Sequence, residues 1–169
     1  MKRNISFGLF LAVIVMAFLA CNTRSMITPV FQTSNTLIRT YTVQDSLGRD
    51  SIVTDTVTFT DSLNVGDTVR MGLMCNGFYD YLKTVKVSGD TSKVKTSLEW
   101  PDSLSYVLAS DADPAHGVLT FLPEKAYAIY TTVTYIPVAS GTHKVDIGLL
   151  SAAPESYNQT AGYFFIAVK

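Results

Sequence analysis

Much of this chain follows a two-residue alternation that only a half-buried β-strand satisfies. In residues 53–60, Val53, Val57 and Phe59 share one parity, while threonines fill the positions of the other parity. Successive side chains of a strand point to opposite faces, so this pattern gives one apolar face and one wet face. Each such strand must bury its apolar face against another layer.

Similar runs recur along the sequence, rich in Val, Ile, Thr, Tyr and Phe and separated by turn residues. Two of them, at 36–43 and 51–60, flank the polar segment 44–50 and predict a β-hairpin. One helical turn near 123–126 is the best candidate for helix, and a strand connection fits there equally well. We therefore predict an all-β antiparallel sandwich, in preference to a barrel. Further strands are expected at 67–75, 82–88, 93–100, 105–109, 117–121, 129–136, 143–150 and 163–169.

Two segments, 63–69 and 137–147, resemble the early and late strands of immunoglobulin-like domains. The resemblance covers residues 62–169 and implies an immunoglobulin-like sandwich. The cysteine pair of antibody domains is missing, so the architecture alone carries over.

The N-terminus has the three parts of a secretory signal: Lys2 and Arg3, an apolar stretch over 7–19, and a small residue at the expected cleavage point. About 13 apolar residues would form a helix of about 20 Å, shorter than the roughly 30 Å hydrocarbon layer, so a retained membrane span is the weaker interpretation. The sequence Phe18-Leu19-Ala20-Cys21 resembles the lipobox of bacterial lipoproteins, although Phe18 replaces the usual small aliphatic residue. This resemblance implies that residues 1–20 are removed and that Cys21 carries acyl chains. An ordinary signal peptide cut near Ala20 is the alternative.

Removing 20 of the 169 residues leaves 149, the size of one domain. Residues 21–35 have no clear period and predict a lipidated tether, followed by one sandwich domain over 36–169 that includes the hairpin. A lipid-anchored protein of the cell envelope is expected, with the outer membrane as the favoured location. Residues 22–25 lack the acidic cluster that resembles an outer-surface export tag, so the periplasmic or surface face stays open.

Acylation of Cys21 would leave Cys75 without a partner for a disulfide. Cys75 shares its parity with Val69, Met71 and Leu73, so it is expected to be a buried and inert thiol. A disulfide-free fold must rely on its apolar core.

A tripeptide of Asp, then Ser or Thr, then an aliphatic residue contains six of the eleven aspartates, against about one expected from composition. It resembles the O-glycosylation sequon of Bacteroidetes-type secreted proteins, in which the central hydroxyl carries the glycan. The alternative is that these aspartates form turns through bonds to nearby backbone. The resemblance implies candidate acceptors at Ser46, Ser51, Thr56, Ser62, Thr68 and Ser103.

No catalytic constellation is recognisable in the sequence, and we predict a protein that is not an enzyme and uses no cofactor or metal. His143 lies in an alternating strand and is expected to be structural, whereas Asp111, Asp113 and His116 share one loop that is more simply a solvated turn than a cation site. The net charge of −1 and the scattered lysines also argue against nucleic-acid binding.

Exposed aromatic rings are the remaining candidates for binding. Tyr79 and Tyr81 follow Asn76-Gly77, and Tyr157 precedes the last strand, so all three are expected in loops. Such rings can stack on sugars, anchor a protein partner, or simply cover the open end of a sandwich. Three hypotheses follow: a lipid-anchored binding or assembly module with an envelope partner, a carbohydrate-binding accessory lipoprotein, or a structural or adhesive subunit that adds a strand through 163–169.

Overall fold

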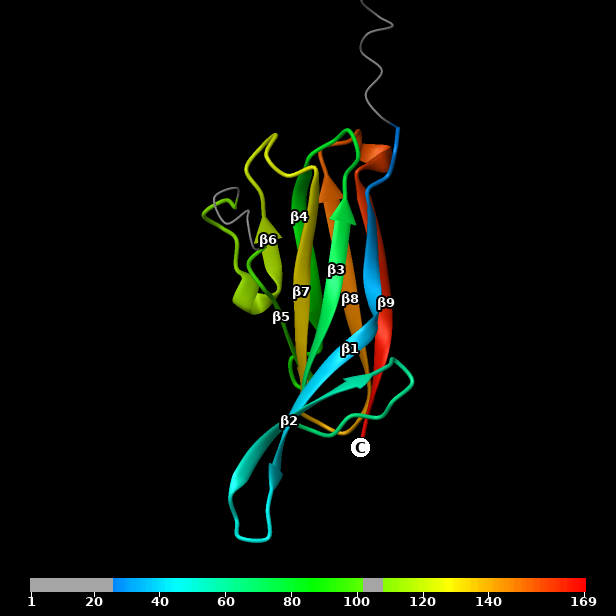
Figure 1. Ribbon diagram of the computed structural model, residues 1–169. Helices are drawn as coiled ribbons and strands as arrows, with labels where there is room; N and C mark the ends of the chain where they lie inside the picture. The colour runs from blue at the N-terminus through cyan, green and yellow to red at the C-terminus, as the bar shows by residue number, and fades with distance from the viewer. Residues whose placement is uncertain (1–25, 102–107) are drawn as a thin grey trace, which may run out of the picture.

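Two antiparallel sheets pack face to face in the computed structural model, which describes residues 26–101 and 108–169 (Figure 1). The five-stranded sheet has the order β2-β1-β3-β7-β5, and the four-stranded sheet has the order β6-β4-β8-β9. This arrangement confirms the predicted all-β sandwich. The strands are β1 (Val30–Gln44), β2 (Asp50–Val57), β3 (Thr68–Asn76), β4 (Leu82–Gly89), β5 (Val94–Leu98), β6 (Val118–Thr120), β7 (Ala128–Pro137), β8 (Gly141–Ser151) and β9 (Gln159–Val168).

Seven of these strands follow the order found in immunoglobulin-like sandwiches. The run β1-β3-β7-β5 corresponds to strands A, B, E and D, and β4-β8-β9 corresponds to C, F and G. The two other strands are additions at sheet edges. Strand β2 extends the five-stranded sheet beyond β1, and β6 extends the four-stranded sheet beyond β4.

The core lies between the sheets and consists of the inward-facing residues of each alternating strand. Residues Val69, Met71, Leu73 and Cys75 of β3 are all buried, as the parity of that segment predicted. They belong to one apolar cluster with Val85 and Val87 of β4, Val133 and Tyr135 of β7, and Val145, Ile147 and Leu149 of β8. Tyr135 also contacts the partly buried Phe164 of β9, with ring centroids 5.7 Å apart.

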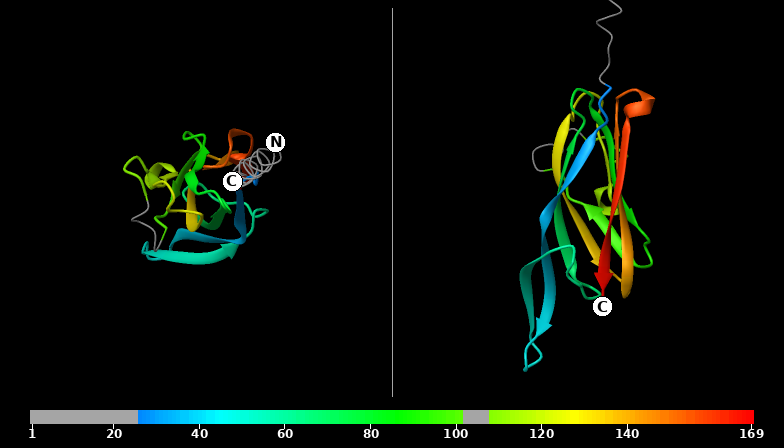
Figure 2. Two further views of the ribbon diagram at one scale, coloured as in Figure 1. Left: turned by 90° about the horizontal axis from the view of Figure 1, so that it is seen from above. Right: turned by 90° about the vertical axis from the view of Figure 1, so that its right-hand side faces the viewer.

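The predicted hairpin is present, but its outer part leaves the sandwich. Strand β1 pairs with β3 as far as Thr40, which lies opposite Thr68 at the beginning of β3. Beyond that point β1 pairs with β2 alone, through to Gln44 opposite Asp50. Residues 41–53, called here the projecting hairpin, therefore extend past the end of the sandwich as a two-stranded ribbon (Figures 1 and 2).

Strand β1 begins at Val30, so residues 30–35 belong to β1 although the sequence had assigned them to the tether, and residues 30–33 pair with β3. The pairing register shifts between Thr33 and Leu37, and the polar residues at this irregularity interrupt the alternation. Ser34 supports the irregularity, because its hydroxyl accepts the Gly72 N–H at 3.1 Å and donates to the Thr36 carbonyl at 2.8 Å.

Helix is confined to two single turns among the described residues, η2 (Pro114–His116) and η3 (Glu155–Tyr157). The helical turn considered near 123–126 is instead a strand connection in which Lys125 N–H donates to the Leu122 carbonyl. Glu124, the third residue of this turn, has φ 60°, a left-handed value that an α-helix does not contain. The expected strand at 105–109 lies mostly outside the described residues, with Leu108 bridging to Phe121.

The chain enters and leaves the sandwich at opposite ends. The first described strand begins at the end where β3 finishes, since Val30 lies opposite Asn76, and the C-terminus lies at the other end, on the side of the projecting hairpin (Figures 1 and 2). The two ends of the molecule can therefore serve different surroundings.

Candidate functional site

Four segments meet at the end of the sandwich where the chain enters, called here the entry end. They are the start of the described chain at 26–29 and the connections 77–81, 122–127 and 152–158. Backbone hydrogen bonds join the connections: Gly77 N–H to the Tyr127 carbonyl at 2.8 Å, and Ala152 N–H to the Tyr81 carbonyl at 2.8 Å. The Thr160 hydroxyl donates to the Pro29 carbonyl and ties the entering chain to the beginning of β9.

The three tyrosines proposed as ligand contacts all lie at the entry end. Tyr79 occupies the turn between β3 and β4 and is 79% exposed, whereas Tyr81 is only half-buried beside it. Tyr157 lies in η3 and is partly exposed at 36%. The structure thus brings together residues that are almost 80 positions apart in sequence. Phe78 beside Tyr79 is exposed as well, and the structure adds exposed Tyr127, which the sequence had not singled out.

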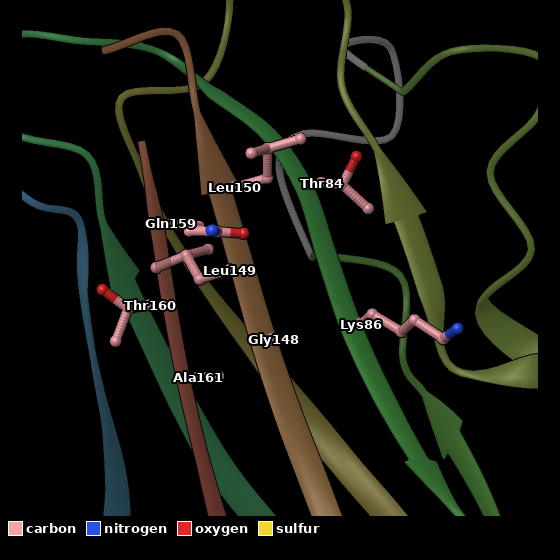
Figure 3. A pocket seen from close by; sticks show the side chains of 8 residues that line it. All are labelled: Thr84, Lys86, Gly148, Leu149, Leu150, Gln159, Thr160 and Ala161. Carbon is pink, nitrogen blue, oxygen red and sulfur yellow. The ribbon is translucent and has the colours of Figure 1, made fainter. Parts of the chain in front are cut away.

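A hollow of about 300 Å³, called here the sheet hollow, lies on the outer face of the four-stranded sheet (Figure 3). It forms because small residues occupy adjacent outward positions, Gly148 on β8 opposite Ala161 on β9. No atom lies within 4 Å of the position that a Cβ of Gly148 would take. Polar side chains of Thr84, Lys86 and Gln159 line the same space.

An aromatic pair borders the sheet hollow on β9. Tyr163 and Phe165 are 62% and 53% exposed, and their ring centroids lie 5.5 Å apart in an edge-to-face arrangement. The Lys144 ammonium lies 4.7 Å from the Tyr163 ring centroid and 2.6 Å from an Asp146 carboxylate oxygen. Tyr163 follows Ala161 on the same face, so its Cα lies about 7 Å along the strand from the Ala161 Cα at the hollow. No motif pointed to this surface, because strand parity alone does not say which face of β9 is covered.

The expected edge for strand addition is partly occupied. At the end of β9, Leu63 N–H donates to the Ala167 carbonyl and Lys169 N–H donates to the Leu63 carbonyl. These bonds use the last part of the segment 163–169 that the sequence had proposed as a free edge.

The projecting hairpin exposes large aliphatic side chains, with Leu47 at 75% and Ile52 at 78%. Its base is held by Arg39, whose Nε donates to Asp55 Oδ1 at 2.9 Å while a second guanidinium nitrogen contacts the other oxygen. This side-chain hydrogen bond holds the pKa of Asp55 below its ordinary value. The Arg39 guanidinium also lies 4.8 Å from the Tyr41 ring centroid.

The candidate glycan acceptors fall into two groups. Ser46, Ser51 and Thr56 are exposed and lie on the hairpin formed by β1 and β2, whereas Ser62 and Thr68 are half-buried near its base. The sixth acceptor, Ser103, lies outside the described residues.

Several aspartates of the same tripeptides cap turns. Asp45 Oδ1 accepts the Leu47 and Arg49 N–H groups at 2.8 and 2.9 Å. Asp61 accepts the Thr58 N–H at 2.7 Å, and Asp67 accepts the Asn64 N–H at 2.8 Å. These contacts give the recurring aspartate a structural reason, which is compatible with modification of the neighbouring hydroxyl.

Both histidines have structural contacts. His143 is 3% exposed, and its Nε2 lies 2.6 Å from the Ala139 carbonyl oxygen, as expected for an inward-facing histidine near a strand end. His116 Nδ1 lies 2.7 Å from Asp113 Oδ2 beside a second hollow of about 390 Å³. Within 26–101 and 108–169, no group of three or more His, Cys, Asp or Glu side chains is arranged to hold a metal ion.

The Cys75 thiol is fully buried, and this burial raises its pKa to about 12. A thiol with such a pKa has almost no thiolate at neutral pH and is therefore a poor nucleophile. The expected burial of Cys75 is confirmed, because the residue lies inside the core.

No protein-family model matches this chain, and no curated protein matches it. Among the described residues, no helix is both long enough and apolar enough to cross a membrane.

Proposed function

We propose that this chain is a non-enzymatic, lipid-anchored protein of a bacterial cell envelope that serves as a binding or assembly module. The observation that carries the proposal is the lipobox-like segment ending in Cys21, which stands only nine residues before the first strand of an all-β domain. A single acyl chain gives only weak membrane attachment. The lipobox that this segment resembles implies several acyl chains on Cys21, which would make the attachment stable. The domain would then need no membrane-spanning element of its own.

The projecting hairpin is the binding element that we favour for a protein partner. It leaves the sandwich, its two strands have no further strand partner among the described residues, and it presents Leu47 and Ile52 to solvent. A two-stranded ribbon is marginally stable in water, so a partner that covers its apolar side chains would gain affinity from burial. Exposed Ser46 and Ser51 on the same ribbon would modulate this contact if they carry glycans.

Membrane fractionation of cells expressing the full chain tests the anchor. The wild-type protein should partition with membranes, and Cys21→Ala should release it to the soluble fraction. Cys75→Ala is the matched control, since it removes the other cysteine and should leave partitioning unchanged. Membrane association that persists in Cys21→Ala would contradict the proposal.

Site-specific photo-crosslinking in cells tests the hairpin. A photoreactive residue at Leu47 should give a discrete adduct with an envelope protein, and the adduct should disappear when Ile52→Asp is added. The same residue at Lys83, exposed near the entry end, serves as the comparison. Absence of an adduct from position 47, or an adduct that persists in Ile52→Asp, would argue against the hairpin as the binding element.

Carbohydrate binding is the second candidate function, and the sheet hollow with its aromatic neighbour favours it. A ring such as Tyr163 can stack on the apolar face of a sugar, while Lys86, Gln159 and Thr84 offer hydrogen-bonding groups in the hollow farther along the same sheet face. This surface is a stronger candidate than the entry end, because a concave, mostly apolar space edged by polar side chains lies on the same sheet face as an exposed aromatic ring.

A glycan array separates this function from protein binding. Gly148→Val would fill the hollow without a clash, since the space around its Cβ position is open. Both Gly148→Val and Tyr163→Ala should weaken binding at least about tenfold, a loss of about 1.4 kcal/mol. Tyr130→Ala, which removes a tyrosine of similar exposure from the other sheet, should have no effect. Absence of any glycan binding by the wild type would remove this candidate.

A further inference from the structure

The entry end carries a concentration of exposed aromatic and aliphatic side chains that the core does not use. Four aromatic residues are exposed there, drawn from three separate connections, and they are accompanied by exposed aliphatic residues. The projecting hairpin at the opposite end exposes aliphatic side chains and no fully exposed aromatic ring. The residues of the entry end and their exposures are Met26 71%, Ile27 41%, Phe78 40%, Tyr79 79%, Leu122 39%, Tyr127 43% and Tyr157 36%.

Chain length limits how far this end can lie from a lipid attached at Cys21. Met26 is five residues after Cys21, and five residues span at most about 18 Å when fully extended. The headgroup region adds about 5–7 Å on each side of the hydrocarbon layer, so the greatest reach from the acylated residue is about three times the thickness of that region. An acylated Cys21 would therefore keep the entry end next to the membrane surface.

We propose that the entry end rests on the bilayer interface, with Tyr79 and its aromatic neighbours at headgroup level, so that the sandwich stands with its projecting hairpin pointing away from the membrane. This inference depends on the proposed lipid anchor at Cys21.

The side chains at the entry end suit a lipid interface. Tyrosine is enriched at membrane–water interfaces because its ring enters the apolar layer while its hydroxyl stays hydrated. The charged residues of the three connections are Asp80, Glu124, Lys125 and Glu155, so these described segments hold no basic cluster. The contact would therefore rely on aromatic and apolar burial, and it should not require anionic lipids.

The hydrogen bonds between the connections make the entry end one surface. The connection 77–81 is bonded to 122–127 and to 152–158, and Pro29 is bonded to Thr160. A membrane contact at Tyr79 would thus orient the whole sandwich. Strand β1 has 15 residues and covers about 45 Å, so the tip of the hairpin would stand at about that height or more above the lipid.

Fluorescence of the full lipidated protein in vesicles tests the orientation. Single cysteines are introduced by Tyr79→Cys, Tyr163→Cys and Leu47→Cys and labelled with an environment-sensitive dye. The native Cys75 does not interfere, because it is buried in the core. The vesicles contain phosphatidylcholine, with and without phosphatidylglycerol, and brominated acyl chains act as quenchers from within the bilayer.

The label at position 79 should shift to shorter wavelength, lose quenching by aqueous iodide and gain quenching by brominated lipid. The label at 163, on the side of the sandwich, and the label at 47, on the hairpin tip, should behave as in water. Neutral and anionic vesicles should give the same result. A label at 79 as accessible to iodide as the label at 47 would overturn the inference. Shielding of position 79 that appears only after an envelope-protein fraction is added would also overturn it, because the end would then bind a protein.

Flotation of the same samples separates this inference from the proposed function. Protein that fails to float with vesicles would refute the anchor itself. Protein that floats while its label at 79 stays in water would leave the anchor intact and refute the orientation alone.

Discussion

The junction between the projecting hairpin and the sandwich depends on Leu37. This residue is 1% exposed, and it lies opposite Val57 of β2 on one side and Met71 of β3 on the other. Replacing a fully buried leucine by alanine costs about 2–5 kcal/mol, because apolar contact is lost and a cavity remains. Strands β2 and β3 flank Leu37 and restrict collapse of the cavity, so we expect Leu37→Ala to lower the free energy of unfolding by about 3 kcal/mol.

Urea unfolding of the mature domain, followed by circular dichroism, measures this cost. With a slope of about 2 kcal/mol per molar urea, the midpoint should fall by about 1.5 M at unchanged slope. Leu47→Ala is the matched control from the same hairpin, and its exposed side chain should contribute less than about 0.5 kcal/mol.

Two results would refute the reasoning. Equal midpoints for Leu37→Ala and Leu47→Ala would mean that the base of the hairpin is not packed into the core. A second, separate transition in Leu37→Ala would mean that the hairpin unfolds independently of the sandwich.

Three further predictions each test one local feature of the fold. Gly117→Ala should destabilise the fold by about 1–3 kcal/mol in thermal unfolding, because Gly117 has φ 75° and an added Cβ would lie 2.2 Å from a carbonyl oxygen of β4, whereas Gly148→Ala should be tolerated. The Arg39 contact lowers the pKa of Asp55 in the folded state. The stabilisation from this contact is therefore present above about pH 4 and is lost as the pH falls further. The stability difference between wild type and Asp55→Asn should accordingly shrink from pH 6 to pH 2. Cys75 should react with a thiol reagent only in denaturant, and rapid labelling of the native protein would contradict its burial.

The sandwich was predictable because apolar residues recur at every second position, which is the side-chain repeat of a β-strand. The odd positions of residues 69–75 are all apolar, and the structure buries Val69, Met71, Leu73 and Cys75 while it leaves Met74 exposed. The hairpin was equally predictable from the sequence, since a polar loop separates two alternating runs of residues.

The beginning of the domain was harder to predict. Thr33, Ser34 and Asn35 give no apolar signal, yet the segment is held in β1 by pairing with β3 and by the Ser34 hydroxyl. Strand pairing of this kind depends on a partner that lies some forty residues away, so local sequence does not reveal it.

The surfaces depend on tertiary contacts in the same way. The loops that carry Tyr79 and Tyr157 were recognisable, but their meeting at the entry end follows from the order of the strands. The sheet hollow depends on Gly148 standing opposite Ala161, a register that no motif encodes.

Mass spectrometry of the native, membrane-extracted protein tests the central claim most directly. The account predicts an N-terminal peptide that begins at Cys21 and carries the mass of its acyl chains, with residues 1–20 absent. Recovery of an N-terminal peptide that retains Met1, with Cys21 unmodified, would contradict it.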